Sequence, residues 1–197
     1  KEGQIRALDR AYENSGVDMD TVGLLEAHGT GTAAGDACEV SAIVEAFPKS
    51  DKRKTVIGSV KSQVGHMRMA AGIGGAMKIA LALYHKVLPN SINMENPNPA
   101  LLDSQLTVLK KSIPWIVNDR QPVRRAGVSA FGFGGTNFHV VMEEYKGDHH
   151  GAYRVGAVPM GVVFTAHSKE ALVAKIEALA ANTSAFRNDE YRYENAE

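Results

Sequence analysis

The sequence predicts an α/β fold in which helices cover a largely parallel or mixed sheet. Two observations support this class. Short aliphatic runs that suit buried strands alternate along the chain with longer segments of helical period, as in layered α/β proteins. In addition, 44% of the 197 residues are hydrophobic, so the chain is long enough and apolar enough to bury a sizeable core.

The first quarter of the chain predicts a helix, a strand and a second helix. Apolar residues recur at helical spacing through residues 2–15, and Gly16 follows as a C-terminal cap. The aliphatic run "TVGLLEAH" at 21–28 suits a buried strand. Residues 36–47, "DACEVSAIVEAF", have helical period, and Asp36 is the predicted N-cap of that helix.

The alternation continues through the middle of the chain. A strand is predicted at 55–60, "TVIGSV", and a long alanine-rich helix over about 67–85. Extended segments follow near 87–93 and 107–115. Residues 124–144, "RRAGVSAFGFGGTNFHVVMEE", predict two strands joined by a glycine-rich turn, which we expect to form a hairpin at the centre of the sheet.

The composition changes after this hairpin, which divides the chain into three parts. We expect residues 1–145 to form one folded part and residues 146–158 to be a polar, glycine-bearing linker. Residues 159–197 then begin a separate, small α/β domain. Within it, "MGVVFTA" at 160–166 predicts a strand, and residues 168–185 predict an amphipathic helix.

Composition excludes several classes of function. The 22 basic and 22 acidic residues cancel, so the chain lacks the positive field of a nucleic-acid-binding protein. The longest apolar run, within residues 69–84, is interrupted by Lys78, which predicts no membrane span, and the polar opening "KEGQIRALDR" predicts no signal peptide. Cys38 is the single cysteine, which excludes an intrachain disulfide framework and suits a cytoplasmic protein.

The loop "HGTGTAAGD" at 28–36 lies between a predicted strand and a predicted helix. Open α/β sheets bind ligands at such junctions. A dinucleotide site would need G-x-G-x-x-G, whereas Gly29, Gly31 and Gly35 give G-x-G-x-x-x-G. The acidic residue at the expected distance, Asp51, falls in the polar turn "PKSDKRK", so we do not favour the nucleotide interpretation.

Two histidines, His28 and His66, each follow an apolar predicted strand. A lone buried histidine is more often a structural residue bonded to the backbone. Two histidines at equivalent junctions can instead meet at one edge of the sheet, where neutral imidazoles can hold a developing oxyanion or act as acid and base. Lys61, five residues before His66, is either a surface lysine or a cation that keeps the imidazoles neutral.

Four motifs in order give the chain a family resemblance: "EAHGTGT", "GSVKSQVGH" followed by "AAGIGGAMKIALAL", "LPNSIN" with "NPNP", and "GVSAFGFGGTNFHVVMEE". Over residues 1–145 the chain resembles the C-terminal half of a β-ketoacyl synthase, most closely those of modular polyketide and polyunsaturated fatty acid synthases. The resemblance implies a thiolase-like fold, layered α-β-α-β-α in the complete domain, and a homodimer. It also implies an acyltransferase that catalyses decarboxylative Claisen condensation of an acyl group with a malonyl-type extender on acyl carrier protein.

The resemblance assigns roles to particular residues. His28 and His66 match the histidines of the family's Cys-His-His triad, and Lys61 matches the lysine that supports the second histidine. Thr30 and Thr32 match the threonines that bind the pantetheine arm of the carrier protein.

Further roles follow from the glycine-rich turn and from one departure. Phe133 matches the aromatic gate beside the nucleophile, and the adjoining backbone at Gly134 helps to form the oxyanion hole. Fatty-acid-type relatives have a glutamate nine residues after the second histidine, where this chain has Gly75, as is usual in multidomain synthases.

The nucleophile of the triad is not among these residues. Cys38 lies inside a predicted helix and is interpreted as structural, so we expect the reactive cysteine upstream of Lys1, in the other half of the synthase. By itself the chain is then an inactive fragment. The alternative is a non-condensing module: a chain-length factor, a decarboxylase or an acyl-binding domain.

No cofactor or metal is expected on the chain itself; the phosphopantetheine belongs to the partner carrier protein. His149 and His150 lack companion ligands for a metal. His139 and Trp115 are interpreted as structural residues.

Overall fold

The computed structural model describes residues 1–47, 55–101, 104–117, 122–146 and 164–181. The chain divides into two compact units, the first formed by Lys1–Trp115 with Arg124–Glu144 and the second by Ile116–Val123 with Tyr145–Glu197. The helices and strands of the first unit are α1 (Glu2–Ser15), η1 (Met19–Thr21), β1 (Leu24–Glu26), α2 (Ala33–Ala46), β2 (Thr55–Gly58), α3 (Lys61–Val64), η2 (Arg68–Ala70), α4 (Ala71–His85), β3 (Val87–Leu88), η3 (Pro99–Leu101), β4 (Leu106–Thr107), β5 (Ile113–Pro114), β6 (Arg125–Phe131) and β7 (Asn137–Glu143).

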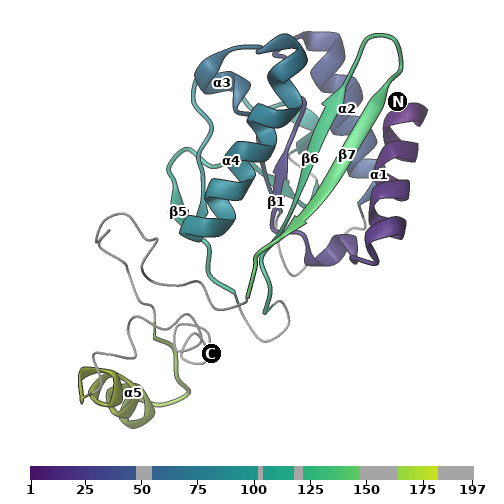
Figure 1. Cartoon of the computed structure of the whole chain (residues 1–197). Helices are drawn as coiled ribbons and strands as arrows, with labels where there is room; N and C mark the ends of the chain where they lie inside the picture. The colour runs from purple at the N-terminus through teal and green to yellow at the C-terminus, as the bar shows by residue number, and fades with distance from the viewer. Residues whose placement is uncertain (48–54, 102–103, 118–121, 147–163, 182–197) are drawn as a thin grey trace. The chain divides into compact units, whose positions relative to one another are not determined.

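The main sheet of the first unit is mixed, as the sequence predicts. Its strand order is β4-β2-β1-β6-β7, in which β4, β2, β1 and β6 run parallel and β7 pairs antiparallel with β6. The predicted hairpin therefore exists, but its placement at the centre of the sheet was wrong, because β7 is an edge strand of the described sheet (Figure 1). A separate pair, β3 and β5, is antiparallel.

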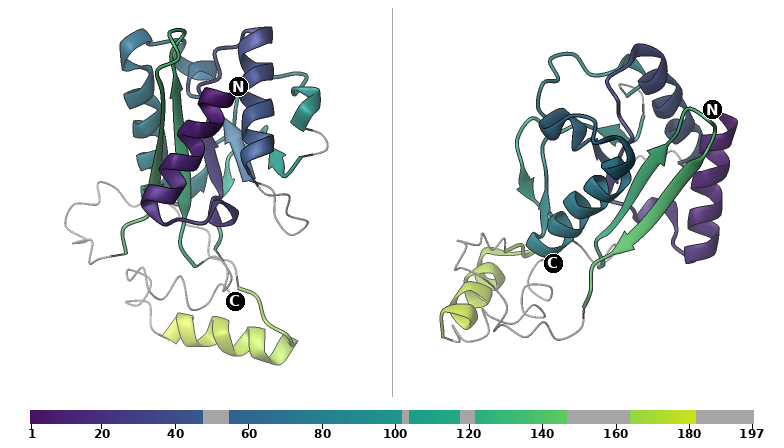
Figure 2. Two further views of the ribbon diagram at one scale, coloured as in Figure 1. Left: turned by 90° about the vertical axis from the view of Figure 1, so that its right-hand side faces the viewer. Right: turned by 45° about the horizontal axis from the view of Figure 1, so that its top comes forward.

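Helices cover both faces of this sheet, with α1 and α2 on one side and α4 on the other (Figure 2). Successive residues of a strand point to opposite faces, so Leu25 packs with the α1–α2 layer while Leu24 packs with the α4 layer. Trp115 is fully buried in the α4 layer, consistent with its interpretation as a packing residue.

Helix α2 begins earlier than the sequence predicts. Its first helical hydrogen bond runs from the Asp36 N–H to the Thr32 carbonyl, so Thr32 is the N-cap and the assignment of Asp36 as N-cap was wrong. The Asp36 carboxylate instead accepts the Gly31 N–H at 3.1 Å. Such a contact and the helix dipole both favour a carboxylate in the first turn of a helix. An acidic residue in the first turn therefore looks, in the sequence, like an N-cap residue.

In the second unit, α5 (Lys169–Ala181) confirms the helix predicted at 168–185 over the residues that the structure describes; residues 182–185 lie outside them. Residues 164–166 are not in a strand, which contradicts that part of the strand predicted at 160–166. Residues 160–163 of that prediction, and residues 147–158 of the linker predicted at 146–158, lie outside the described residues.

His139 lies on β7 between two hydroxyl groups. Its Nδ1 is 3.0 Å from the Ser129 Oγ, and its Nε2 is 3.1 Å from the Tyr12 hydroxyl of α1. Gly127, on the neighbouring strand, leaves room for the ring, because a Cβ there would be 2.5 Å from the His139 Nε2. The imidazole thus joins α1 to the hairpin, in keeping with the structural role expected of it.

This contact predicts acid sensitivity. Burial lowers the pKa of His139 from 6.5 to about 4, so between these values the unfolded chain binds more protons than the folded one. Stability therefore rises with pH across this window and is lost as the pH falls, by about 2–3 kcal/mol from this residue. Urea unfolding between pH 7 and pH 4 should give a flatter dependence for His139→Gln than for the parent. The exposed His85→Gln is the control and should keep the parent's slope; equal slopes for parent and His139→Gln would contradict the prediction.

Candidate active site

The ends of two parallel strands bring His28 and His66 together. Strands β1 and β2 are neighbours, so their carboxyl ends lie at the same edge of the sheet. His28 follows the end of β1 by two residues, and His66 follows β2 after the single turn of α3. The two imidazole rings have centroids 5.5 Å apart and planes at 84°.

A backbone contact determines which ring nitrogen of His66 carries the proton when the ring is neutral. Its Nδ1 accepts the Arg68 N–H at 2.9 Å, so a neutral His66 ring carries its proton on Nε2. Arg68 adopts a left-handed backbone conformation, with φ 53°, which is costly for a residue with a side chain. The strained turn directs this N–H at the ring and leaves the Nε2–H as a donor.

His28 is held in its neutral form. Burial, with smaller contributions from the charges of Lys61 and His66, lowers the pKa of His28 from 6.5 to about 4. Its Nδ1 is buried and has no hydrogen-bond partner among the described residues. At pH 7 a neutral imidazole can donate one N–H and accept at its other nitrogen.

A buried carboxylate that sequence reasoning missed holds the loop of His28. Glu39 of α2 is 4% exposed and accepts the backbone N–H groups of His28 and Gly29, at 2.7 and 2.8 Å. Burial raises the pKa of Glu39, and these two hydrogen bonds act in the opposite direction. Position 39 faces inward in a helix of otherwise apolar inward positions, and a charged residue there is the signal that could have identified it.

Lys61 begins α3, between the two histidines in the chain. Burial lowers the pKa of Lys61, whereas the carboxylates of Glu26 and Glu39 raise it. Its charge in turn lowers the pKa of His28, so the lysine disfavours the imidazolium form there. This is the direction expected for a cation that keeps the His28 imidazole neutral.

A second missed carboxylate belongs to Glu26, the last residue of β1. It is 2% exposed and forms an ion pair with Lys78 of α4, with 2.7 Å between the Lys78 Nζ and the Glu26 Oε2. The Glu26 Oε1 accepts the Val60 N–H at 2.5 Å. Burial raises the pKa of Glu26, and Lys78 opposes that shift.

The two threonines lie on the loop between β1 and α2. Their hydroxyl oxygens, Thr30 Oγ1 and Thr32 Oγ1, are 3.1 Å apart. Thr32 is exposed and Thr30 half-buried. Hydroxyl groups placed in this way can donate to and accept from an amide-containing ligand.

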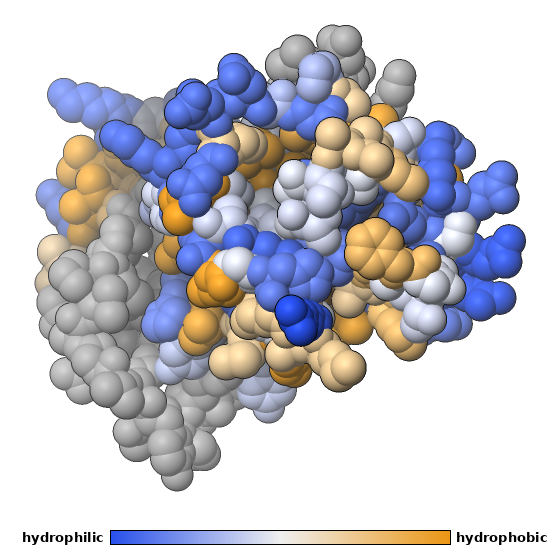
Figure 3. Space-filling view, turned by 90° about the horizontal axis from the view of Figure 1, so that it is seen from above, coloured by the Kyte–Doolittle hydropathy of each residue, from blue (hydrophilic) through white to orange (hydrophobic). Residues whose placement is uncertain are grey.

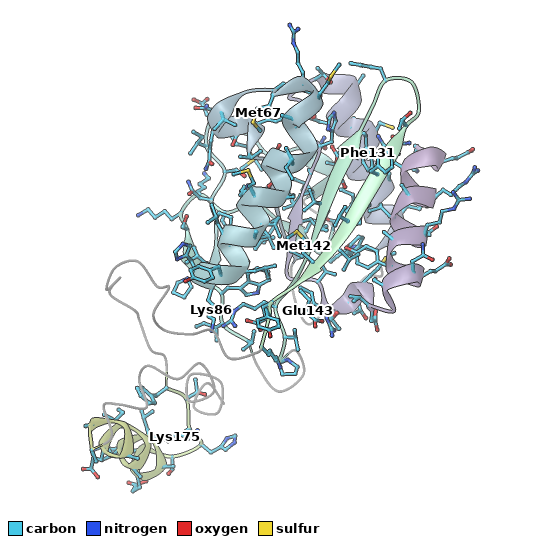
Figure 4. The ribbon with its side chains drawn as sticks, viewed as in Figure 1. Met67, Lys86, Phe131, Met142, Glu143 and Lys175 are labelled. Atoms are coloured by element: carbon cyan, nitrogen blue, oxygen red, sulfur yellow. The ribbon has the colours of Figure 1, made fainter. Side chains whose placement is uncertain are left out.

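The glycine-rich turn between β6 and β7 closes with a hydrogen bond from the Gly132 N–H to the Thr136 carbonyl. Phe133 and Gly134 are exposed on this turn, so the structure places neither against the histidines. Phe131, which Figure 4 labels at the end of β6, is buried instead. Its ring centroid is 6.3 Å from that of His28. Sequence reasoning missed Phe131, although it is the last apolar residue before the turn.

Cys38 does not join the histidines. Its Sγ lies 3.7 Å from the Gln4 Oε1, on the side of α2 that faces α1. Because it is the only cysteine of the chain, the residues beside His28 and His66 include no thiol. In the described ranges no group of three or more His, Cys, Asp or Glu residues could hold a metal ion.

Several apolar side chains of the first unit are exposed. Ile73, Met77 and Leu81 lie along one side of α4 and are exposed; we call them the open α4 face. A groove of about 570 Å³ is lined by Met77 and Leu81 of this face, together with Val64 of α3 and Met67. Apolar side chains also reach the surface at the end where α3 and the β6–β7 turn lie (Figure 3).

The described part of the chain contains no helix of the length and apolar character needed to span a membrane.

Comparison with known families covers nearly the whole chain. Residues 1–95 match the beta-ketoacyl synthase C-terminal domain, and residues 96–194 match the ketoacyl-synthetase C-terminal extension. The chain is 42% identical over 198 residues to a polyunsaturated fatty acid synthase polypeptide of Thraustochytrium, covering 95% of this chain and 7% of that protein. It is 37% identical over 179 residues to erythronolide synthase EryA2 of Saccharopolyspora erythraea, covering 90% and 5%.

Solved structures show the same fold. Ketosynthase twelve of the bacillaene polyketide synthase from Bacillus amyloliquefaciens matches with a TM-score of 0.67 and 32% identity, covering 99% of this chain and 35% of that one. The ketosynthase of module 6 of the bacillaene synthase from Bacillus subtilis 168 matches with a TM-score of 0.68 and 33% identity, covering 99% and 34%. The chain therefore spans about a third of these structures and a small fraction of the curated relatives. The match confirms the predicted thiolase-like fold.

Proposed function

Because this chain belongs to the β-ketoacyl synthase family and corresponds to the C-terminal part of its ketosynthase domain, we propose that it supplies the histidine half of a condensing active site. The observation that carries the proposal is the His28–His66 pair, with rings 5.5 Å apart, His28 neutral and the proton of His66 directed to Nε2. The reaction is decarboxylative condensation of an acyl group with a malonyl-type extender, as part of polyketide or fatty acid biosynthesis. The enzyme is accordingly an acyltransferase.

In the first half-reaction, the thiolate of a cysteine upstream of Lys1 attacks the carbonyl carbon of an acyl thioester. The bond to the donor sulfur breaks, the donor thiol leaves, and the acyl group is held as a thioester of the cysteine. In the second, the malonyl thioester loses carbon dioxide, and the electrons of the broken carbon–carbon bond form an enolate. Donors such as the Nε2–H of His66 and an N–H of His28 stabilise the enolate oxygen. The enolate carbon then attacks the acyl thioester, a carbon–carbon bond forms, and the cysteine thiolate leaves.

Other residues serve the carrier-bound substrate. We assign Thr30 and Thr32 to the pantetheine arm, since their hydroxyls stand 3.1 Å apart on the histidine loop. Phe133, on the exposed turn, acts as the gate beside the nucleophile, and the backbone at Gly134 contributes to the oxyanion hole. The phosphopantetheine belongs to the acyl carrier protein, and the chain itself binds no cofactor in this reaction.

The open α4 face is the surface on which we expect an upstream partner to pack. Ile73, Met77 and Leu81 expose apolar surface beside the groove at α3, which in a complete synthase is removed from water. We assign this face to the upstream half of the ketosynthase domain, in an enzyme that works as a homodimer. A cytoplasmic location suits the proposal, because the cysteine nucleophile has to remain reduced.

The organisation proposed for the chain follows the composition of its sequence. Residues 1–145 belong to the ketosynthase domain, residues 146–158 are a linker, and residues 159–197 begin the domain that follows the ketosynthase.

The proposal is tested by comparing this chain with a longer protein that also contains the segment upstream of Lys1. With an acyl-pantetheine thioester and malonyl carrier protein, mass spectrometry should show acylation of an upstream cysteine and a condensed product in the longer protein. The 197-residue chain should give no condensed product. A stable acyl adduct on Cys38 together with condensed product would contradict the assignment. A glutamine in place of the upstream cysteine would instead favour the alternative, a decarboxylase or chain-length factor.

A further inference from the structure

The Glu26–Lys78 ion pair lies where the two histidine loops begin and is used by no step described above. One oxygen of the Glu26 carboxylate accepts the Val60 N–H and the other accepts the Lys78 ammonium. Val60 is the N-cap of α3, the turn that carries Lys61 and leads to His66. Glu26 itself is the last residue of β1, two residues before His28. A single side chain therefore joins the starting points of both loops.

The space around this carboxylate is filled. A Cβ built on Gly75 of α4 would lie 3.0 Å from the Glu26 Cγ, 3.2 Å from the Val128 Cγ1 and 3.6 Å from the Glu26 Oε1. Glycine at position 75 is thus the residue that lets the Glu26 side chain pass between β1 and α4. A Cβ at position 75 would be tight against the Glu26 Cγ and in ordinary contact with the Glu26 Oε1, so a larger side chain there requires the Glu26 side chain to shift.

We propose that Glu26 is a positioning residue of the active site: its carboxylate, held between the Val60 N–H and the Lys78 ammonium, sets the separation of the His28 and His66 loops. The claim about catalysis rests on the proposed function, whereas the claim about geometry concerns this chain alone. The contacts further suggest that position 75 can supply the same carboxylate from α4, since a side chain starting there enters the same space.

Three variants test the proposal. Glu26→Gln keeps the shape of the side chain but replaces one carboxylate oxygen with an NH2 group. That NH2 group must face either the Val60 N–H or the Lys78 ammonium, both of which are donors, so one hydrogen bond is lost. The exchange variant Glu26→Asn with Gly75→Glu moves the carboxylate from β1 to α4. Glu144→Gln is the matched control, because Glu144 also forms a buried ion pair, at 2.7 Å with Arg124, the residue that precedes β6.

The first measurement uses the 197-residue chain with labelled histidines. Nuclear Overhauser effects between the His28 and His66 rings should be present in the parent and in Glu144→Gln, lost or weakened in Glu26→Gln, and recovered in the exchange variant. The second measurement uses the longer protein with its upstream half. Malonyl decarboxylation should fall about 10–100-fold in Glu26→Gln. Acyl transfer to the cysteine should change by less than about threefold, and the exchange variant should recover most of the decarboxylation rate.

Each outcome bears on one claim. If Glu26→Gln keeps the inter-ring effects and the decarboxylation rate, or loses both to the same extent as Glu144→Gln, the positioning role is overturned. If Glu26→Gln does not fold, the exchange variant decides: recovery of fold and ring contact supports the role, and failure of the exchange overturns it. If the parent longer protein has no decarboxylation activity while the ring contacts change as expected, the proposed function fails and the positioning of the loops by Glu26 stands.

Discussion

Alanine at either His28 or His66 should lower malonyl decarboxylation by about 10²–10³-fold in a synthase that contains this chain and its upstream half, equivalent to about 3–4 kcal/mol. Each substitution removes one preorganised N–H donor from the developing enolate. The loss should be seen in the rate of carbon dioxide release from malonyl carrier protein, measured separately from acyl loading. Loading relies chiefly on the thiolate and the backbone oxyanion hole, so at least one of the two variants should load with a smaller loss.

A suitable control is His167→Ala, at an exposed histidine just before α5, which should leave both half-reactions unchanged. The assigned roles would have to be abandoned if both active-site variants decarboxylated within about threefold of the parent, a difference of about 0.65 kcal/mol.

Removing the Glu39 carboxylate should give the largest loss of stability near the site. Glu39→Ala leaves the His28 and Gly29 N–H groups without their charged acceptor, and each such hydrogen bond contributes about 1.5–3 kcal/mol. We therefore expect the free energy of unfolding to fall by about 3 kcal/mol or more. Denaturant unfolding of the chain measures this change directly.

Asp36→Ala provides the comparison, because Asp36 makes a single, exposed contact to the same loop, with the Gly31 N–H. Its expected cost is about 1 kcal/mol or less. Equal losses for Glu39→Ala and Asp36→Ala would show that the loop of His28 is not held by the buried carboxylate.

The fold was predictable where local periodicity determines the element. Helix α1 and its Gly16 cap follow from apolar spacing and from a left-handed residue, with φ 64°, that only glycine adopts without strain. The start of α2 was not predictable in the same way, since an acidic residue in the first turn satisfies the same preferences as a cap. The edge position of β7 depends on pairing between segments distant in sequence, which periodicity does not report.

In the candidate site, too, some residues could be identified from the local sequence and others could not. The histidines stand out because each follows an apolar run, a pattern visible within ten residues. The contact from Glu26 to Val60 joins residues 34 positions apart, and the packing of Phe131 against His28 joins β6 to the end of β1. Such partners become visible only when the order of the strands is known.

The left-handed turn at Arg68 means that a backbone hydrogen bond, and no side chain, determines the tautomer of His66. The donor to the His66 Nδ1 is a peptide N–H two residues away, so no neighbouring side chain has to be retained for the proton to stay on Nε2. The side chain at position 68 can therefore drift during evolution, to glycine or asparagine with less strain, without altering the chemistry of the ring. The segment from Lys61 to Arg68 contains both the His66 ring and the N–H that sets its tautomer. We therefore expect the His66 proton to stay on Nε2 when this segment is transferred to another ketosynthase.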